Sequence, residues 1–224
     1  MRLIYLEERK GLFIVLEGID GTGKTTQAKK LKKRLMKLGY QVAIYKEPTN
    51  ETEAGKKIRS SYTSGRPSLE TELGWFIEDR EWNVKTRVMP ALEAKQIVLL
   101  DRYFYSTACY QGARKNGDWQ NILALNRSMF PEPDLIIIFD LDPQKASERI
   151  TRTRKKTNTF EEIEYLRMVR KLFLEMSNED TQGNYFIIDA SQRIKKISHQ
   201  LFERILPLIG NKNMKNCLKT TLED

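Results

Sequence analysis

The chain alternates short apolar runs with longer segments in which apolar residues recur every three or four positions. Short, partly β-branched apolar runs predict buried strands, and the longer spacing predicts amphipathic helices. The predicted strands are residues 12–17, 42–45, 97–100, 135–139 and 185–188. The predicted helices are residues 24–38, 54–63, about 68–93, 103–111, 119–129, 143–151, 160–179 and 191–208. This alternation predicts a three-layer α/β fold, in which a five-stranded parallel sheet carries helices on both faces.

Glycine and proline residues set boundaries in this pattern. Gly39 follows the first predicted helix, and we expect it to end that helix as a C-cap. Pro48 ends the second strand region, because proline has no N–H for a ladder hydrogen bond. Pro90 lies inside the third predicted helix, where the missing N–H and the ring predict a kink or a break.

The length and composition favour one large domain. The chain has 224 residues, of which 40% are hydrophobic, so it can bury a real core. We expect a single domain over residues 1–210 and a polar tail over residues 211–224. No apolar run reaches the ~18 residues of a membrane helix, and the first ten residues lack a signal-peptide core. With only two cysteines, Cys109 and Cys217, we expect a cytoplasmic protein without a structural disulfide.

The net charge of +9 raises the alternative of nucleic-acid binding. Six of the basic residues lie on the polar faces of the first helix, which is typical of a solvated surface. They are not interleaved with the aromatic residues that stack on single-stranded bases. Because a protein that handles polyphosphates also needs cations, we expect small phosphorylated partners, and neither nucleic acid nor membrane.

The most specific motif is the segment from Gly18 to Thr25, which fits G-x-x-x-x-G-K-[ST]. A predicted strand precedes it and a predicted helix follows it, which is the order that a phosphate-binding loop requires. Its glycines allow successive N–H groups to point inward, and the helix dipole adds partial positive charge. We therefore expect this loop to bind nucleotide phosphates through residues Gly18, Ile19, Asp20, Gly21, Thr22, Gly23, Lys24, Thr25 and Thr26. Lys24 supplies a cation for the β- and γ-phosphates, and Thr25 a hydroxyl for Mg²⁺.

Two more candidates directly follow the third predicted strand. A carboxylate at Asp101 can hold Mg²⁺, and the guanidinium of Arg102 can contact a phosphate with two hydrogen bonds. A salt-bridged strand end is the structural alternative. Ligands of parallel sheets bind beyond the carboxyl ends of the strands, so we expect both residues to converge there with Asp20 and Glu47.

A basic stretch at about residues 151–159 lies between two predicted helices and contains Arg152 and Arg154. Such a run is usually a solvated loop. The competing interpretation is a lid that closes over ATP, in which an arginine stabilises charge on the transferred phosphoryl group.

Phe76 and Arg80 are one helical turn apart and share a face. Periodicity alone favours Phe76 as a core residue. The alternative is that Phe76 stacks on a base while Arg80 contacts the base edge.

These residues together resemble the thymidylate kinase family. The resemblance covers about residues 12–208, which is nearly the whole domain, and it is far more specific than the phosphate loop alone. The matching segments are residues 13–27, Lys46-Glu47-Pro48, Phe76 with Arg80, Asp101-Arg102-Tyr103, Ser106-Thr107, Tyr110-Gln111, Pro133-Asp134-Leu135 and residues 160–174.

The resemblance implies a kinase that transfers the γ-phosphoryl group of ATP to dTMP with Mg²⁺, giving dTDP and ADP. It implies an acceptor site for dTMP formed by Glu47, Arg59, Phe76, Arg80, Arg102, Ser106, Thr107 and Gln111. In addition, Asp20 matches a carboxylate beside the acceptor and the metal, which completes the catalytic candidates Lys24, Arg102, Arg152, Arg154 and Asp20. The resemblance also implies a homodimer.

Two departures from the family pattern affect this assignment. Many members have arginine where this chain has Lys46, and lysine lacks the planar guanidinium fork. The family also divides by whether the catalytic arginine lies in the phosphate loop or in the lid. Because Ile19 and Thr22 are not basic, this chain resembles the lid type, with Arg152 and Arg154 both open as candidates.

Other functions stay open at this point. A deoxynucleoside kinase would need a general base for a sugar hydroxyl, for which Glu47 or Asp20 could serve. A broader pyrimidine monophosphate kinase would also accept dUMP or dCMP. A nucleotide-dependent switch is disfavoured, because the D-x-x-G element at residues 180–183 stands at the wrong place in the order of elements. A nucleic-acid-binding ATPase would explain the charge, but the chain lacks a second module.

Overall fold

The computed structural model of this chain describes residues 10–154, 160–179 and 184–212. Five parallel strands form one sheet in the order β2-β3-β1-β4-β5. The strands are β1 (Leu12–Glu17), β2 (Val42–Lys46), β3 (Ile97–Asp101), β4 (Leu135–Asp140) and β5 (Tyr185–Asp189). All five predicted strands are therefore confirmed, together with the predicted fold class.

The helices lie where the apolar periodicity predicts them, with end points that shift by a few residues. They are α1 (Lys24–Lys37), α2 (Glu53–Ser64), α3 (Leu69–Asn83), α4 (Met89–Glu93), α5 (Phe104–Gly112), α6 (Trp119–Met129), α7 (Pro143–Arg154), α8 (Phe160–Asn178) and α9 (Ile194–Asn211). Gly39 follows α1 with φ 86° and donates its N–H to the carbonyl of Met36, as expected of a glycine that ends a helix.

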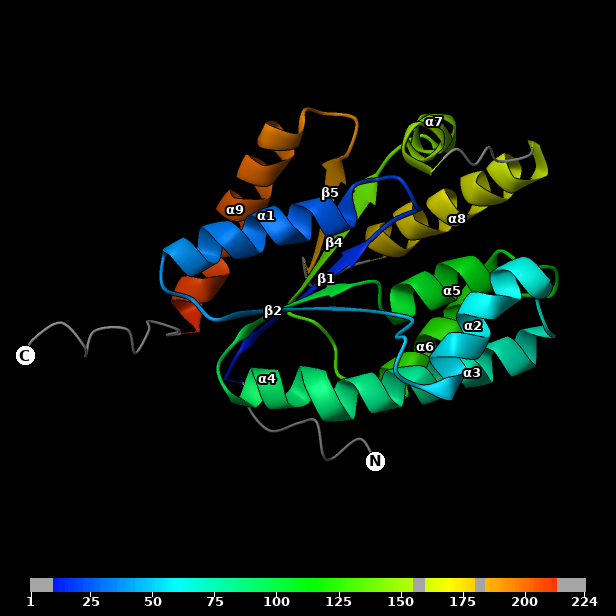
Figure 1. Cartoon of the computed structure of the whole chain (residues 1–224), viewed down its shortest axis with the longest axis horizontal. Helices are drawn as coiled ribbons and strands as arrows, with labels where there is room; N and C mark the ends of the chain where they lie inside the picture. The colour runs from blue at the N-terminus through cyan, green and yellow to red at the C-terminus, as the bar shows by residue number, and fades with distance from the viewer. Residues whose placement is uncertain (1–9, 155–159, 180–183, 213–224) are drawn as a thin grey trace, which may run out of the picture.

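The core sits on both faces of the central strands. Every residue of β1 and β3 is buried, which explains why both strands are continuous apolar runs up to their last residues, Glu17 and Asp101. Helices α1 and α9 pack together on one face of the sheet, and α4 lies on the opposite face (Figure 1). None of the described helices is long and apolar enough to cross a membrane.

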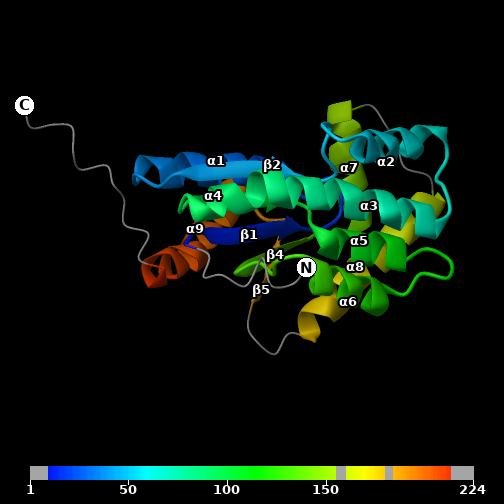
Figure 2. The same cartoon turned by 90° about the horizontal axis from the view of Figure 1, so that it is seen from below.

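The irregularity expected at Pro90 takes a different form. The chain stays helical, and a π-helical turn, η2 (Val84–Val88), joins α3 to α4, which carries this proline in its first turn. Proline has no N–H for the carbonyl four residues earlier, and a wider turn absorbs that missing bond without breaking the helix. The segment therefore runs on without a break (Figure 2).

The basic stretch expected to form a loop begins as a helix. Helix α7 extends to Arg154, so positions 152 and 154 are helical and that part of the loop prediction is wrong. The rest of the predicted lid, residues 155–159, lies outside the described residues, as do residues 180–183 and the tail from residue 213 on. Asn211, expected to begin the tail, is the last residue of α9.

Beyond the carboxyl ends of the strands, helices α2, α3, α5, α6 and α8 gather on one side of the molecule (Figure 2). Strand β1 lies between β3 and β4, so the chain leaves the sheet in different directions on either side of it. Such a point in a parallel sheet leaves a crevice for ligands. The phosphate loop follows β1 and therefore opens at this crevice.

Candidate active site

The phosphate loop connects β1 to α1, and its shape depends on glycine. Gly21 has φ 83°, and a Cβ placed there would lie 2.5 Å from the carbonyl oxygen of Ala146 on α7. Gly23 has φ 93° and is the N-cap of α1, with no side-chain cap. Both backbone conformations disfavour residues with a Cβ, and the loop leaves the first N–H groups of α1 for an anion.

The Lys24 side chain folds over this loop. Its ammonium donates hydrogen bonds to the carbonyl oxygens of Gly18 and Ile19, each at 2.8 Å. Burial, together with the nearby positive charge of Arg102, lowers the pKa of Lys24 to about 8. The backbone carbonyls thus hold the ammonium in the loop. A phosphate oxygen can take their place as the acceptor of its hydrogen bonds.

Thr25 and Asp101 meet beside the loop. The hydroxyl of Thr25 donates to Oδ2 of Asp101 at 2.5 Å, while Oδ1 of Asp101 is buried without a hydrogen-bond partner. Oxygen atoms of this kind are the ligands that Mg²⁺ takes. Within the described residues, no group of three or more acidic, histidine or cysteine side chains is placed to hold a metal ion.

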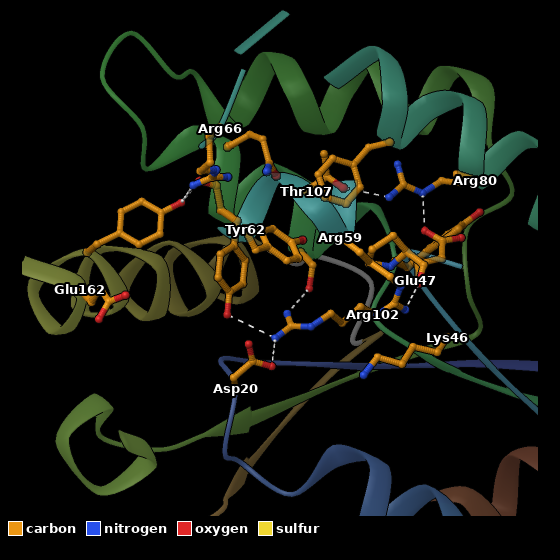
Figure 3. Close-up of a pocket in the computed structure, with 17 residues that line it drawn as sticks. Asp20, Lys46, Glu47, Arg59, Tyr62, Arg66, Arg80, Arg102, Thr107 and Glu162 are labelled. Atoms are coloured by element: carbon orange, nitrogen blue, oxygen red, sulfur yellow. Dashed lines mark hydrogen bonds and ion pairs between the residues drawn. The ribbon is translucent and has the colours of Figure 1, made fainter. Parts of the chain in front are cut away.

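A pocket of about 490 Å³ opens at the same sheet edge (Figure 3). All eight residues that the resemblance assigns to the acceptor line it, namely Glu47, Arg59, Phe76, Arg80, Arg102, Ser106, Thr107 and Gln111. Asp20 of the phosphate loop also lines it. Asp101, which we expected at the same edge, faces Thr25 and does not line the pocket.

Arg102 stands where the loop meets the pocket. Its Nη2 donates to Oδ1 of Asp20 at 2.9 Å and to the hydroxyl of Tyr110 at 3.2 Å, and its Nη1 donates to Oγ of Ser106 at 2.8 Å. Figure 3 shows the side chains of Arg102 and Asp20 pointing toward each other. The guanidinium holds the pKa of Asp20 well below its usual range. This cation therefore lies between the phosphate loop and the acceptor pocket.

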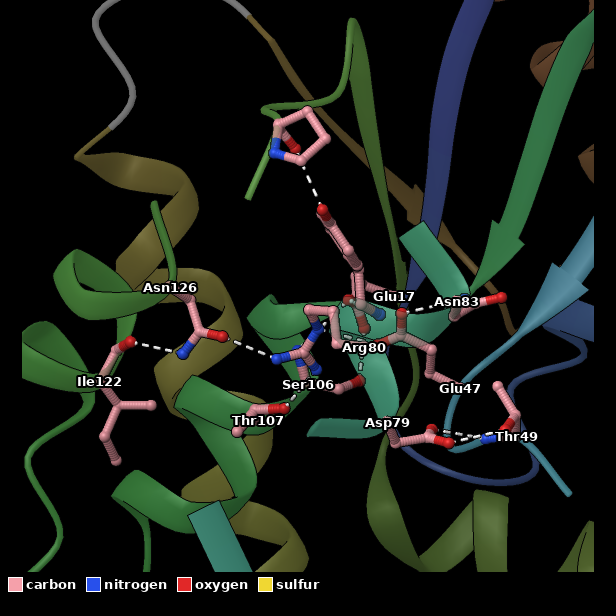
Figure 4. Close-up of polar contacts among 12 residues, drawn as sticks. Glu17, Glu47, Thr49, Asp79, Arg80, Asn83, Ser106, Thr107, Ile122 and Asn126 are labelled. Carbon is pink, nitrogen blue, oxygen red and sulfur yellow. Dashed lines mark hydrogen bonds and ion pairs between the residues drawn. The ribbon is translucent and has the colours of Figure 1, made fainter. Parts of the chain in front are cut away.

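Arg80 lines the same pocket and is only 1% exposed. Its three nitrogens donate to Glu47 at 2.8 Å, to Oδ1 of Asn126 at 2.6 Å and to Oγ1 of Thr107 at 2.8 Å (Figure 4). Burial raises the pKa of Glu47, and the charge of Arg80 opposes that shift. With its partners arranged around it, the guanidinium keeps one orientation relative to the pocket.

Two further predicted residues complete the pocket wall. Arg59 donates from Nε to the carbonyl of Thr49 at 3.2 Å and from Nη2 to the carbonyl of Pro48. Gln111, with its amide oriented to satisfy both of its polar atoms, donates to the carbonyl of Thr107 at 2.7 Å. Both side chains are therefore positioned by backbone groups of the pocket itself.

Several site residues were missed by sequence reasoning. Tyr62, Arg66 and Tyr165 line the pocket from α2, from the α2–α3 connection and from α8. Behind them, Glu72 is fully buried, and its carboxylate accepts from Nε and from Nη2 of Arg66, at 3.0 Å each. These side chains come from segments far apart in the chain, and no local spacing links them. Tyr110, which also lines the pocket, had a signal, because the Tyr110-Gln111 segment matches the family pattern.

A phosphate-binding loop beside a cation-lined pocket, at the switch point of a parallel sheet, defines a nucleotide-binding phosphotransferase of the phosphate-loop class. The sequence also matches the family model of thymidylate kinase over residues 16–201. The chain belongs to the thymidylate kinase family.

Individual relatives match over most of their length. A probable thymidylate kinase of Archaeoglobus fulgidus is 40% identical over 205 residues, which cover 90% of this chain and 100% of the relative. A thymidylate kinase of Leptospira interrogans is 35% identical over 213 residues, which cover 93% of this chain and 100% of the relative. A probable thymidylate kinase of Pyrococcus horikoshii is 43% identical over 175 residues, which cover 75% of this chain and 83% of the relative.

Proposed function

We propose that this chain transfers the γ-phosphoryl group of ATP to dTMP and releases dTDP and ADP. The observation that carries the proposal is the position of Arg102, which is bonded to Asp20 of the phosphate loop while it lines the adjoining pocket. Two phosphorylated ligands at one sheet edge then share a single cation between them. Family membership supports dTMP as the acceptor.

In this reaction the bond from the γ-phosphorus to the ADP oxygen breaks, and a bond to an oxygen of the dTMP phosphate forms. The acceptor phosphate is already an anion, so no strong base is needed. The work left to the protein is positioning and charge stabilisation. Lys24 serves the donor phosphates, and Arg59 and Arg102 hold the acceptor phosphate in line.

The surroundings of Glu47 support a monophosphate acceptor over a nucleoside. A nucleoside kinase needs a carboxylate free to take a hydroxyl proton. Both carboxylate oxygens of Glu47 are already occupied, by Arg80 at 2.8 Å and by Nδ2 of Asn83 at 3.0 Å. Asp20 is a weak base as well, because Arg102 lowers its pKa.

Thr25 and Asp101 are the residues that would hold Mg²⁺. The buried and unpartnered Oδ1 of Asp101, beside the Thr25 hydroxyl, supports this assignment, because a hard cation takes oxygen ligands. When bound, Mg²⁺ neutralises charge on the phosphate oxygens.

The packing of α7 supports Arg154 over Arg152 as the catalytic lid arginine. A Cβ on Gly21 would lie 3.2 Å from Cγ1 of Ile150, so Ile150 lies on the face of α7 that adjoins the phosphate loop. Position 154 follows Ile150 by one helical turn and shares that face, whereas position 152 does not.

Three properties remain predictions: the homodimer, the single domain over residues 1–210 and the cytoplasmic location. The homodimer rests on family resemblance, and size-exclusion chromatography with light scattering tests it directly.

A substrate panel tests the proposal. Purified protein with Mg-ATP is assayed for ADP release with dTMP, dUMP, dCMP and thymidine. We expect kcat/KM to be highest for dTMP and turnover of thymidine to be negligible. A preference for thymidine would show a nucleoside kinase, and equal rates with dCMP would show a broader monophosphate kinase.

A further inference from the structure

Helix α5 begins without a cap of its own. The N-cap residue, Tyr103, makes no side-chain hydrogen bond to the first turn, although the first N–H groups of any helix need partners. Glu17, the last residue of β1, supplies the partner from outside. Its Oε1 accepts from the backbone N–H of Tyr103 at 2.8 Å and from that of Ser106 at 3.2 Å. A fully buried carboxylate on a strand therefore caps the helix that carries the pocket wall.

The residue just before this helix has a strained backbone. Arg102 adopts φ 72°, a left-handed conformation that costs a residue with a long side chain about 1–3 kcal/mol. Its N–H donates to the carbonyl of Leu16 at 3.0 Å, and the next N–H donates to Glu17. The last two residues of β1 thus hold the backbone of Arg102 in this conformation.

Glu17 is also connected to the Arg102 side chain. The hydroxyl of Ser106 donates to Oε2 of Glu17 at 2.5 Å, and its oxygen accepts from Nη1 of Arg102 at 2.8 Å. Figure 4 shows Glu17 and Ser106 side by side in this network. One carboxylate therefore fixes the backbone of Arg102 through the helix start, and its guanidinium through a single hydroxyl.

We propose that Glu17 is a positioning residue of the phosphoryl-transfer site: it does not line the acceptor pocket, and it acts by holding Arg102 in place. This inference rests on the proposed function. A misplacement of about 1 Å in a group that aligns a substrate costs about 100-fold in rate. Loss of this carboxylate therefore affects catalysis through Arg102.

The test is a double-mutant cycle of Glu17→Gln with Arg102→Met, measured as kcat/KM for dTMP. The glutamine keeps an oxygen for the two backbone N–H groups, but its amide nitrogen cannot accept from Ser106. We expect Glu17→Gln alone to lower kcat/KM by about 10- to 100-fold. In the Arg102→Met background, the same substitution should change kcat/KM by less than about twofold, because coupled residues are not additive.

Asp118→Ala is the matched control. Asp118 caps α6 by accepting from the N–H groups of Gln120 and Asn121, at 3.1 and 3.0 Å, and no residue of α6 lines the pocket. Loss of such a cap lowers stability by about 0.5–2 kcal/mol. We expect Asp118→Ala to lower the melting temperature while kcat/KM stays unchanged. This comparison separates loss of a helix cap from loss of Arg102 positioning.

Two results would overturn the inference: a Glu17→Gln enzyme within twofold of wild type, or effects that multiply in the double mutant. If Glu17→Gln does not fold, Ser106→Ala replaces it in the same cycle, since it removes the hydroxyl that links Glu17 to the guanidinium. A Ser106→Ala effect that persists in full without Arg102 is then the refuting result. If the wild-type chain prefers another monophosphate, the proposed function fails, and the cycle is measured with that substrate.

Discussion

Asn126 offers a sharp test of how the side chains of the pocket are positioned, because it binds Arg80 from outside the pocket. It lies on α6, is fully buried and does not line the pocket. Its Oδ1 accepts from Nη1 of Arg80 at 2.6 Å, and its Nδ2 donates to the carbonyl of Ile122. In Asn126→Ala, the Arg80 guanidinium loses one of its three partners in a buried setting.

The expected magnitude follows from these contacts. A hydrogen bond to a charged group contributes about 1.5–3 kcal/mol to stability. Alanine has a higher helix propensity than asparagine, so the exchange within a helix offsets about 0.5 kcal/mol of that loss. We therefore expect the free energy of unfolding to fall by about 1–2.5 kcal/mol. For a chain of this length, each kcal/mol corresponds to about 2–4 °C in melting temperature.

The matched control is Asn121→Ala on the same helix. Asn121 is exposed and pairs with Asp118 at 2.7 Å, so its loss should change stability by no more than about 0.5 kcal/mol. Both variants are compared with wild type by urea unfolding, and their KM for dTMP is measured. We expect only Asn126→Ala to raise KM, because only it releases the guanidinium that faces the pocket. Equal unfolding free energies for the two variants, or an unchanged KM in Asn126→Ala, would refute the reasoning.

Four further predictions concern the loop, the lid and the buried carboxylate. Lys24→Ala should lose most turnover while dTMP still binds with similar affinity by calorimetry, because Lys24 serves the donor phosphates. Arg154→Ala should lower kcat more than it raises KM for dTMP, whereas Arg152→Ala should leave both near wild type; the reverse order would show that the packing of α7 does not select the arginine. Gly21→Ala should weaken ATP binding and lower the melting temperature, since a Cβ would lie 2.5 Å from a carbonyl oxygen of α7. Burial raises the pKa of Glu17 to about 7 from 4.5, so its stability contribution is full below pH 4.5 and is lost as pH rises through 7. The unfolding free energy of wild type minus that of Glu17→Gln should accordingly fall between pH 4.5 and pH 7. A difference that does not change with pH would contradict the raised pKa of Glu17.

Much of the architecture follows from local sequence alone. Strands buried on both faces must be continuous apolar runs, and covering helices must carry an apolar stripe, so the order of elements is visible in the hydrophobic pattern. The phosphate loop is equally local, because its glycines, Lys24 and Thr25 are neighbours in the chain. Since parallel strands end at one edge, the residues after β1, β2 and β3 were also predictable as site residues.

The tertiary structure decided how those residues are held. Glu17 and Arg102 are 85 positions apart in number, and Arg80 and Asn126 are 46 apart, so neither pair has a spacing that a local pattern records. The sequence places Arg152 and Arg154 in one basic stretch, and only the structure shows that α7 packs against Gly21 through Ala146 and Ile150. Local periodicity determines which surface of each element is apolar, whereas the partner of a buried charge depends on how elements meet in space. The hydrophobic pattern and the phosphate-loop motif thus determined the fold class and the kind of ligand, and long-range packing determined the geometry that orients the ligand.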